Sequence, residues 1–289
     1  MKKVALKVAY LGTNFHGFQR QPDQRTVEDE LIYTLKKLEY INDLKKAHFG
    51  IAGRTDRGVH AMGNVISFMS EKEILINQIN DHLPDDVKIL AIAKVPYGFK
   101  PRYAKQRHYK YIISENVLSY PLKWNLNVPK NGFDLDKMSE AANYFKGEHN
   151  FINFSKRCER NPMRTVDDIC VEKKGHIVSI DVWGESFLWN MVRKMVKPIL
   201  EVGNGKLEPK IILEMLNPEN KFNIKTMAPD NLILMDTEYH KIKFKYDLYA
   251  CHRFQTILQD ELFKHKSLLD LEEIMLDKVS TLKIDAQKK

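Results

Sequence analysis

The stretch of sequence that decides both fold and chemistry reads AGRTDRGVHA and covers residues 52–61. Gly53 and Gly58 flank a turn in it, and the residues from Val59 onward are typical of a strand. Such a turn can present the carboxylate of Asp56 at the floor of a cleft. The arginines on either side of Asp56 would keep this carboxylate ionised. An ionised carboxylate can act as nucleophile, general base or stabiliser of a cation, although the pattern alone also fits an ordinary turn aspartate.

The residues around this turn predict alternating strands and helices in the first half of the chain. Thr26 and Asp29, three residues apart, predict the N-cap of a helix in which leucines recur at helical spacing. Pro84 ends a second predicted helix. The predicted strands cover residues 3–10, 59–68, 87–95 and 103–113, and the predicted helices begin at residue 26 and cover residues 74–83.

The second half has a similar order of elements. Its apolar patterns predict strands at 166–171, 177–182, 232–239 and 241–246, and helices at 134–146 and 187–202. Pro198 lies inside the last helix and should kink or end it. Helices alternating with paired strands on this scale indicate an α+β fold, with two ferredoxin-like halves that share one sheet.

This pattern divides the chain into three parts. The first half is expected at residues 1–115 and carries Asp56, and the second half is expected at residues 116–251. The boundary would fall near a stretch rich in Pro, Trp and Asn at residues 117–132. Residues 252–289 are mostly charged and helical in pattern, and they are predicted to form an appended helix with a soluble tail.

Composition and charge narrow the class of protein. The chain has 289 residues, with 46 Lys and Arg against 38 Asp and Glu, which gives a formal net charge of +8. This charge suits a polyanionic partner, either nucleic acid or an anionic membrane surface, and equally a basic protein with neither. No apolar run approaches the roughly 18 residues that span a bilayer. Three cysteines, an odd number, argue against a disulfide framework and favour a cytoplasmic protein.

The segment at 52–61 resembles the catalytic motif AGRTDxGVHA of the TruA family of tRNA pseudouridine synthases. The resemblance continues, in order, along most of the chain. Its further matches are YLGTNFHGFQRQ at 10–21, FKPRY at 99–103, RHYKY at 107–111, GEHNFINF at 147–154, FLWNMVRKMV at 187–196, and AP with LILMDTEY at 228–229 and 232–239. The departures are Arg57, which is more like archaeal and eukaryotic relatives, Phe18 for Trp, Lys197-Pro198 for Val-Gly, and Asn231 for Gly.

The resemblance implies the pseudouridine synthase fold, in which two ferredoxin-like α/β halves surround a mixed, mostly antiparallel sheet with a central active-site cleft. It implies that Asp56 is the nucleophile and that Arg193 pairs with it. Tyr109 would stack on the target base and share in proton transfer, and Arg54 would displace that base from its stack. Without the resemblance, a strand tyrosine and an arginine at the edge of an apolar helix are more often packing residues.

The implied reaction isomerises uridine, whose N1–C1′ bond breaks before the base rejoins the ribose through C5. No electron, group donor or metal enters the net reaction, so no cofactor and no metal are expected. The sequence has no GxGxxG, P-loop or HExxH motif and no Cys/His ligand cluster. The acidic pairs at 85–86 and 167–168 are predicted as solvated loop residues.

Basic residues with neighbouring aromatics are the candidates for binding RNA. The candidate binding residues, besides Tyr109, are Arg102, Lys105, Arg107, Lys110, Arg57 and His60, and a second basic segment contains Lys156, Arg157, Arg160 and Arg164. The resemblance implies a homodimer that binds the anticodon stem-loop of tRNA, with uridines at positions 38, 39 and/or 40 as targets, and no membrane partner.

Two other classes of protein fit the same residues less well than a pseudouridine synthase does. A non-catalytic RNA-binding module with ferredoxin-like halves would show RNP-type aromatic strands, which the sequence lacks. An Asp-dependent hydrolase or transferase would need a second catalytic carboxylate or a metal cluster, and neither is evident.

Overall fold

The structure, a computed structural model, describes residues 1–115, 129, 132–156 and 160–287, and side chains of the last helix up to residue 279. The predicted boundary stretch at 117–132 lies largely outside the described residues, and Arg157 lies outside them too. The strands are β1 (Lys2–Tyr10), β2 (Gly50–Ile51), β3 (His60–Ser70), β4 (Val87–Lys94), β5 (Gln106–Ser114), β6 (Gly147–Asn150), β7 (Met163–Lys174), β8 (Ile177–Gly184), β9 (Leu232–Glu238) and β10 (Lys245–Tyr246). The helices are α1 (Val27–Lys37), α2 (Ile76–His82), α3 (Leu135–Asn143), α4 (Met191–Gly203), α5 (Ile211–Leu216) and α6 (Leu248–Gln287), with 3-10 turns at Gly12–Asn14 and Ile152–Phe154.

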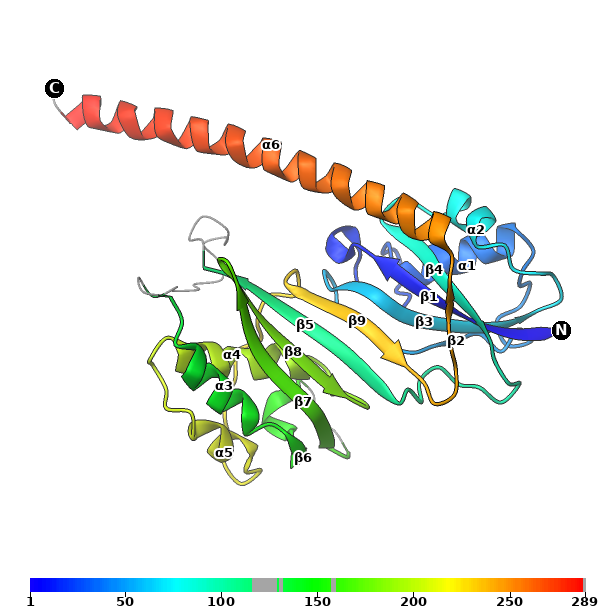
Figure 1. Ribbon diagram of the computed structural model, residues 1–289, viewed down its shortest axis with the longest axis horizontal. Coiled ribbons are helices and arrows are strands. Elements are labelled where there is room, and N and C mark those ends of the chain that lie inside the picture. The colour runs from blue at the N-terminus through cyan, green and yellow to red at the C-terminus, as the bar shows by residue number, and fades with distance from the viewer. Residues whose placement is uncertain (116–128, 130–131, 157–159, 288–289) are drawn as a thin grey trace.

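One sheet runs through the molecule (Figure 1). Its strand order is β10-β4-β1-β3-β9-β5-β8-β7-β6, and β2 pairs with β3 outside this path. The pairing of β3 with β9 is parallel, and the other pairings of the described strands are antiparallel. The predicted α+β fold with a mixed, mostly antiparallel sheet is therefore confirmed.

The start of α1 shows how the sequence determines a local element. The Thr26 hydroxyl accepts a hydrogen bond from the Asp29 amide at 3.3 Å and donates one to the Asp29 carboxylate at 2.7 Å. This N-cap satisfies an amide that the first turn leaves free. Leu31 and Leu35 are fully buried, so the predicted apolar face of the helix is the one that packs on the sheet.

The core consists of two large clusters that meet in the middle of the sheet. In one cluster, α1 and α2 pack with β1, β3 and β4, and in the other, α3 and α4 pack with β5, β7 and β8 (Figure 1). Leu232 of β9 belongs to the second cluster, whereas Leu234 belongs to the first. Tyr109 of β5 packs against both. The junction of the two halves is therefore built by β9 and β5.

The predicted division at residue 115 stays a prediction. β5 falls in the range predicted for the first half, but it pairs with β8 and β9, and its Tyr111 and Ile113 belong to the second cluster. These pairings favour a boundary before β5.

The helix predicted over 187–202 differs from the structure at both ends. α4 begins at Met191, because Asn190 adopts a left-handed conformation with φ 64° that breaks the helical path. Pro198 lies inside α4 and does not end it, since the helix continues to Gly203. Val196, Ile199 and Leu200 are buried around the proline, so packing outweighs its helix-breaking tendency. The strand predicted at 241–246 shortens to the two residues of β10.

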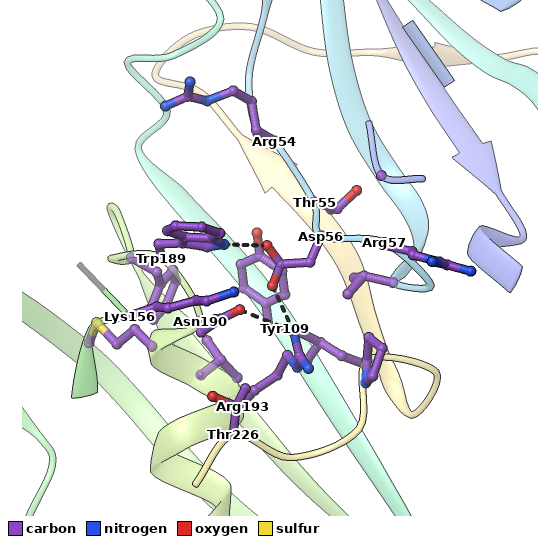
Figure 2. A pocket seen from close by; sticks show the side chains of 18 of the residues that line it. Arg54, Thr55, Asp56, Arg57, Tyr109, Lys156, Trp189, Asn190, Arg193 and Thr226 are labelled. Carbon is purple, nitrogen blue, oxygen red and sulfur yellow. Dashed lines mark hydrogen bonds and ion pairs between the residues drawn. The ribbon is translucent and has the colours of Figure 1, made fainter. Parts of the chain in front are cut away.

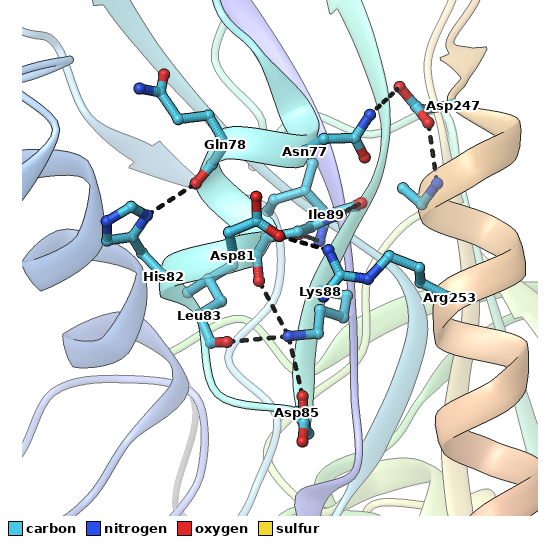
Figure 3. A network of polar contacts seen from close by, with 12 residues as sticks. Asn77, Gln78, Asp81, His82, Leu83, Asp85, Lys88, Ile89, Asp247 and Arg253 are labelled. Atoms are coloured by element: carbon cyan, nitrogen blue, oxygen red, sulfur yellow. Dashed lines mark hydrogen bonds and ion pairs between the residues drawn. The ribbon is translucent and has the colours of Figure 1, made fainter.

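The last helix, α6, is fixed to the body of the protein at its first turns (Figure 3). Arg253 forms an ion pair with Asp81 of α2, and the Asn77 amide donates to Asp247 at 3.4 Å. Beside them, buried Lys88 donates to the carbonyls of Asn80 at 3.1 Å and Leu83 at 2.9 Å, and burial lowers its pKa. Farther along, α6 projects away from the rest of the molecule (Figure 1).

The helix in the region of the predicted extension, α6, begins at Leu248, four residues before the predicted start, and is described to Gln287. Among the helices that the structure describes, none is long and apolar enough to cross a membrane.

Candidate active site

A cleft of about 1810 Å³ opens where the two halves meet. Segments far apart in the sequence line it, and Asp56 lies on its wall (Figure 2). Most of the lining comes from residues 16–19, from 52–59, from Arg107 and Tyr109 of β5, from 186–194, and from 223–226 with 229, 230 and 232, and Thr13, Gln21, Lys156 and Arg164 complete it. A space of this size exceeds that of a typical small-molecule pocket and can admit a nucleotide with its neighbours.

The carboxylate of Asp56 accepts one hydrogen bond on each oxygen. The indole Nε1 of Trp189 donates to Oδ1 at 2.8 Å, and Nη1 of Arg193 donates to Oδ2 at 2.9 Å. The side chain of Asp56 is 22% exposed and that of Arg193 is 12% exposed, so the ion pair is largely shielded from water. Asp56 is therefore fixed in orientation and compensated in charge, while one side remains open to the cleft.

Arg193 is itself held in place at the start of α4. Its Nε donates to the carbonyl of Met227 at 2.7 Å, and Nη1 also donates to Oδ1 of Asn190 at 3.0 Å. The left-handed backbone of Asn190 brings the residues just before α4 to the edge of the cleft. Three contacts thus fix the planar guanidinium, a geometry that a lysine could not reproduce.

The arginines that flank Asp56 in the sequence do not pair with it. Arg54 is exposed and donates from Nη1 to Oε1 of Gln19 at 3.2 Å, and Arg57 is exposed as well. Figure 2 shows both side chains directed away from Asp56. Gln19 holds Arg54 on the outer side of the turn, so the cation beside Asp56 comes from α4, more than 130 positions away in the chain.

Buried polar contacts hold the turn that carries Asp56. The Asn64 amide donates to the Gly53 carbonyl at 3.0 Å and accepts from the Gly53 amide at 3.2 Å. The Tyr10 hydroxyl lies 2.8 Å from Oγ1 of Thr55, and burial raises the pKa of Tyr10 so that it stays protonated. The turn is therefore preorganised by two strands of the first half, β1 and β3.

Two glycines allow the chain to pass closely behind this turn. A Cβ atom at Gly12 would lie 2.1 Å from the carbonyl oxygen of Val59, which no side chain can tolerate. Gly58 has φ +84°, a conformation that other residues rarely adopt. Glycine is therefore required at position 12 by the close approach to residues 58 and 59, and at position 58 by its backbone conformation.

Tyr109 lies beside Asp56 in the cleft (Figure 2). Its ring meets Phe187 edge to face, with centroids 5.3 Å apart. Burial raises the pKa of Tyr109, and the charge of Asp56 acts in the same direction, so the phenol is protonated at neutral pH. The side chain can offer an aromatic surface and a hydroxyl donor to a bound base.

The other predicted binding residues divide between the cleft and the rest of the surface. Arg57 and Arg107 line the cleft. Arg107 is buried, and its guanidinium donates to the carbonyls of Ala52 at 2.8 Å, of Arg102 at 3.0 Å and of Glu185. These contacts tie the turn at 52–58 to its neighbours, which favours a positioning role for Arg107 over direct contact with RNA.

Lys156 and Arg164 of the second basic segment also line the cleft, whereas His60, Lys105, Lys110 and Arg102 do not. Both ring nitrogens of His60 are occupied by backbone groups, the Gly12 amide at 3.1 Å and the Asp230 carbonyl at 3.1 Å, and burial lowers its pKa. Lys110 forms an ion pair with Asp181 at 2.8 Å, and Lys105 lies 3.9 Å from Glu238. Arg102 stacks on the ring of Tyr103 at 4.6 Å.

Sequence reasoning missed Trp189 and Asn190 as members of the site. Both lie in the segment FLWNMVRKMV, whose apolar spacing assigned them to a helix. The structure places them in the irregular segment before α4, where the Trp189 ring also lies 4.6 Å from Nζ of Lys156. The one signal in the sequence was the position of Trp189, four residues before Arg193, the arginine expected to pair with Asp56. Within the part of the chain that the structure describes, no three His, Cys, Asp or Glu side chains gather to hold a metal ion.

Comparison with known proteins identifies the family. The family model described as tRNA pseudouridine synthase matches residues 6–104 and 141–240. The tRNA pseudouridine synthase A of Methanobrevibacter smithii is 50% identical over 98% of this chain and 99% of its own length. Those of Methanothermobacter thermautotrophicus and Methanosarcina acetivorans are 46% and 40% identical, over 98% and 94% of this chain and 98% of their own lengths. A solved structure titled "Crystal Structure of a Cbf5-Nop10-Gar1 Complex" matches with a TM-score of only 0.33 and 18% identity, covering 68% of this chain and 45% of its own.

The chain therefore belongs to the tRNA pseudouridine synthase family, whose members are isomerases that act on tRNA. The resemblance inferred from the sequence is confirmed.

Proposed function

We propose that the protein converts uridine to pseudouridine in the anticodon stem-loop of tRNA, at positions 38, 39 and/or 40, with Asp56 as the nucleophile. The observation that carries the proposal is the carboxylate of Asp56, held between Trp189 and Arg193 in a cleft large enough for a nucleotide. Family membership supports the reaction class, and the geometry supports the choice of residue.

The isomerisation requires a few bond changes and proton transfers, in which Asp56, Arg193 and Tyr109 can take part. The N1–C1′ bond breaks, the base turns, a C5–C1′ bond forms, C5 loses a proton and N1 gains one. Asp56 can serve by adding to the base, by attacking the ribose or by assisting a glycal route. In each case Arg193 compensates its charge in a shielded site, and Tyr109 offers its ring to the base.

The rim of the cleft offers cations for the phosphates of a folded RNA. The basic residues that line the cleft include Arg54, Arg57, Lys156, Arg164 and Lys225. Their contribution to affinity would fall with rising salt concentration. We further propose that the protein works in the cytoplasm as a homodimer, as the family resemblance implies.

Removing the hydroxyl of Tyr109 tests its part in proton transfer. Tyr109→Phe keeps the ring and its edge-to-face contact with Phe187, so tRNA affinity should stay within about threefold of wild type. Loss of a positioned proton donor should lower the single-turnover rate by about 10²-fold or more. Single-turnover kinetics and equilibrium binding give the two values, and a rate equal to that of wild type would restrict Tyr109 to stacking.

Arg54 is proposed to enter the space that the extruded base leaves. It is exposed at the rim, two residues before Asp56, and among the described residues Gln19 accepts the hydrogen bond of its guanidinium. Because a guanidinium stacks on bases and a lysine ammonium does not, Arg54→Lys should lower the rate on a paired uridine by about tenfold or more. The defect should shrink when the uridine sits in a mismatch, where extrusion costs less.

The test compares single-turnover rates of Arg54→Lys, Arg54→Ala and the control Gln19→Ala on paired and mismatched tRNA transcripts. Gln19→Ala removes the resting contact of Arg54 without removing its cation, so it should react nearly as fast as wild type. Equal rates for both Arg54 variants and wild type on the paired uridine would exclude a flipping role.

A further inference from the structure

A second cavity lies next to the segment that leads into the catalytic turn. Its volume is about 610 Å³, and it is lined by Lys3 of β1, by residues 48–51 and by residues 97–102. Four lining side chains can carry positive charge, and among the described lining residues none is Asp or Glu. These four are Lys3, His48, Lys100 and Arg102. The cavity is therefore cationic without an acidic partner of its own.

The two lysines are close enough to repel each other. Nζ of Lys3 donates to the carbonyl of Tyr97 at 3.0 Å, which holds the ammonium next to another lining residue. Burial and the charge of Lys100 both lower the pKa of Lys3. An anion bound between the two ammonium groups would relieve this repulsion.

An exposed aromatic ring stands beside these cations. Tyr97 is 65% exposed. Its ring is nevertheless held by His48, because its hydroxyl lies 3.1 Å from Nε2 of His48 and the two rings meet edge to face with centroids 5.2 Å apart. Tyr103 is 63% exposed and carries the guanidinium of Arg102 on its ring. Fixed, exposed aromatic rings among cations are the arrangement with which proteins bind unpaired nucleotides.

The second cavity and the active-site cleft are lined by adjoining segments of the chain. Ile51 lines the cavity, and the next residue, Ala52, lines the cleft. Arg107 donates to the carbonyls of both Ala52 and Arg102, so it holds the two linings in a fixed relation.

We propose that this second cavity is an RNA subsite, in which Lys3 and Lys100 bind a phosphate of the substrate tRNA and Tyr97 stacks on an unpaired base next to it. The proposal rests on the proposed function, since it takes tRNA as the ligand. It extends the binding surface beyond the cleft, to residues that carry no part of the reaction.

The test is a titration of an unmodified tRNA transcript at several salt concentrations. Lys100→Gln is expected to raise the Kd for tRNA about fivefold and to reduce the slope of log K against log salt by about 0.7–0.9, the value of one lost phosphate contact. Tyr97→Leu is expected to raise the Kd about tenfold with an unchanged slope, because stacking carries no counterion release. Lys100→Arg keeps the charge, and Tyr97→Phe loses the hydroxyl contact but keeps the ring and its edge-to-face contact with His48, so both should bind nearly as tightly as wild type.

Lys206→Gln is the matched control, since Lys206 is an exposed lysine that lines neither cavity. The subsite is excluded if Lys100→Gln and Tyr97→Leu bind tRNA with the Kd and salt slope of Lys206→Gln. Thermal unfolding of each variant shows that the fold is intact. Pseudouridine formation by the wild type is measured in parallel, so a wild type that binds tRNA through Lys100 and Tyr97 but forms no product would overturn the proposed function and leave the subsite standing.

Discussion

Replacing Asp56 with Asn is expected to abolish pseudouridine formation while leaving tRNA affinity within about threefold of wild type. The amide keeps the shape of the carboxylate and can still accept the hydrogen bond from Trp189. It carries no negative charge and is a poor nucleophile, so the single-turnover rate should fall by at least about 10⁴-fold, as when other enzymes lose a nucleophile. Single-turnover assays and filter binding measure the two effects separately.

Asp230→Asn supplies the matched control for this change. Asp230 is a second aspartate on the wall of the same cleft, and the Asp230 contact that we find with His60 is made by its backbone carbonyl. Its amide variant should therefore retain a rate within about tenfold of wild type. Product formation well above background by a verified Asp56→Asn protein would remove Asp56 from its assigned role.

Arg193→Met is expected to produce the second large effect, on both rate and stability. It leaves the carboxylate of Asp56 without its cation and the Met227 carbonyl and Asn190 side chain without a donor. The free energy of unfolding should fall by about 2 kcal/mol, less than for a fully buried pair because Asp56 is partly exposed. The rate should fall by about 10³-fold, since the site loses its charge compensation and the fixed orientation of Asp56.

A double-mutant cycle isolates the ion pair from the other contacts of Arg193. Adding Asp56→Asn to Arg193→Met removes the uncompensated charge, so urea denaturation should show the double variant to be more stable than the sum of the single changes predicts. Lys197→Met on the same helix removes a partly exposed pair with Glu201 and should cost less than about 1 kcal/mol. Strict additivity of Asp56→Asn and Arg193→Met would show that the two side chains are not coupled.

The sequence predicted the sheet and most of its helices because local patterns decide them. Alternation along β1 and β3 and the cap at Thr26 depend on neighbours within a few residues, and the structure has these elements where they were predicted. The path of residues 187–190 could not be predicted in this way. Their apolar spacing fits a helix, but the left-handed Asn190 and the contact of Trp189 with Asp56 depend on packing between the two halves.

The candidate RNA-binding residues also show that local sequence patterns do not reveal contacts between distant parts of the chain. Lys110 lies on a strand next to Tyr109, and alternation places it on the opposite face of the sheet, where it pairs with Asp181. Arg107 points toward the cleft, but its donors are taken by backbone carbonyls. A count of basic residues in a segment says nothing about which of them already have partners, and only the tertiary structure shows it.

The most direct measurement of the central claim is the mapping of pseudouridine in an unmodified tRNA transcript after incubation with the protein. Wild type and Asp230→Asn should introduce pseudouridine at one or more of positions 38, 39 and 40, and Asp56→Asn should introduce none. The account is contradicted if the wild type leaves these uridines unchanged, or if Asp56→Asn modifies them as the wild type does.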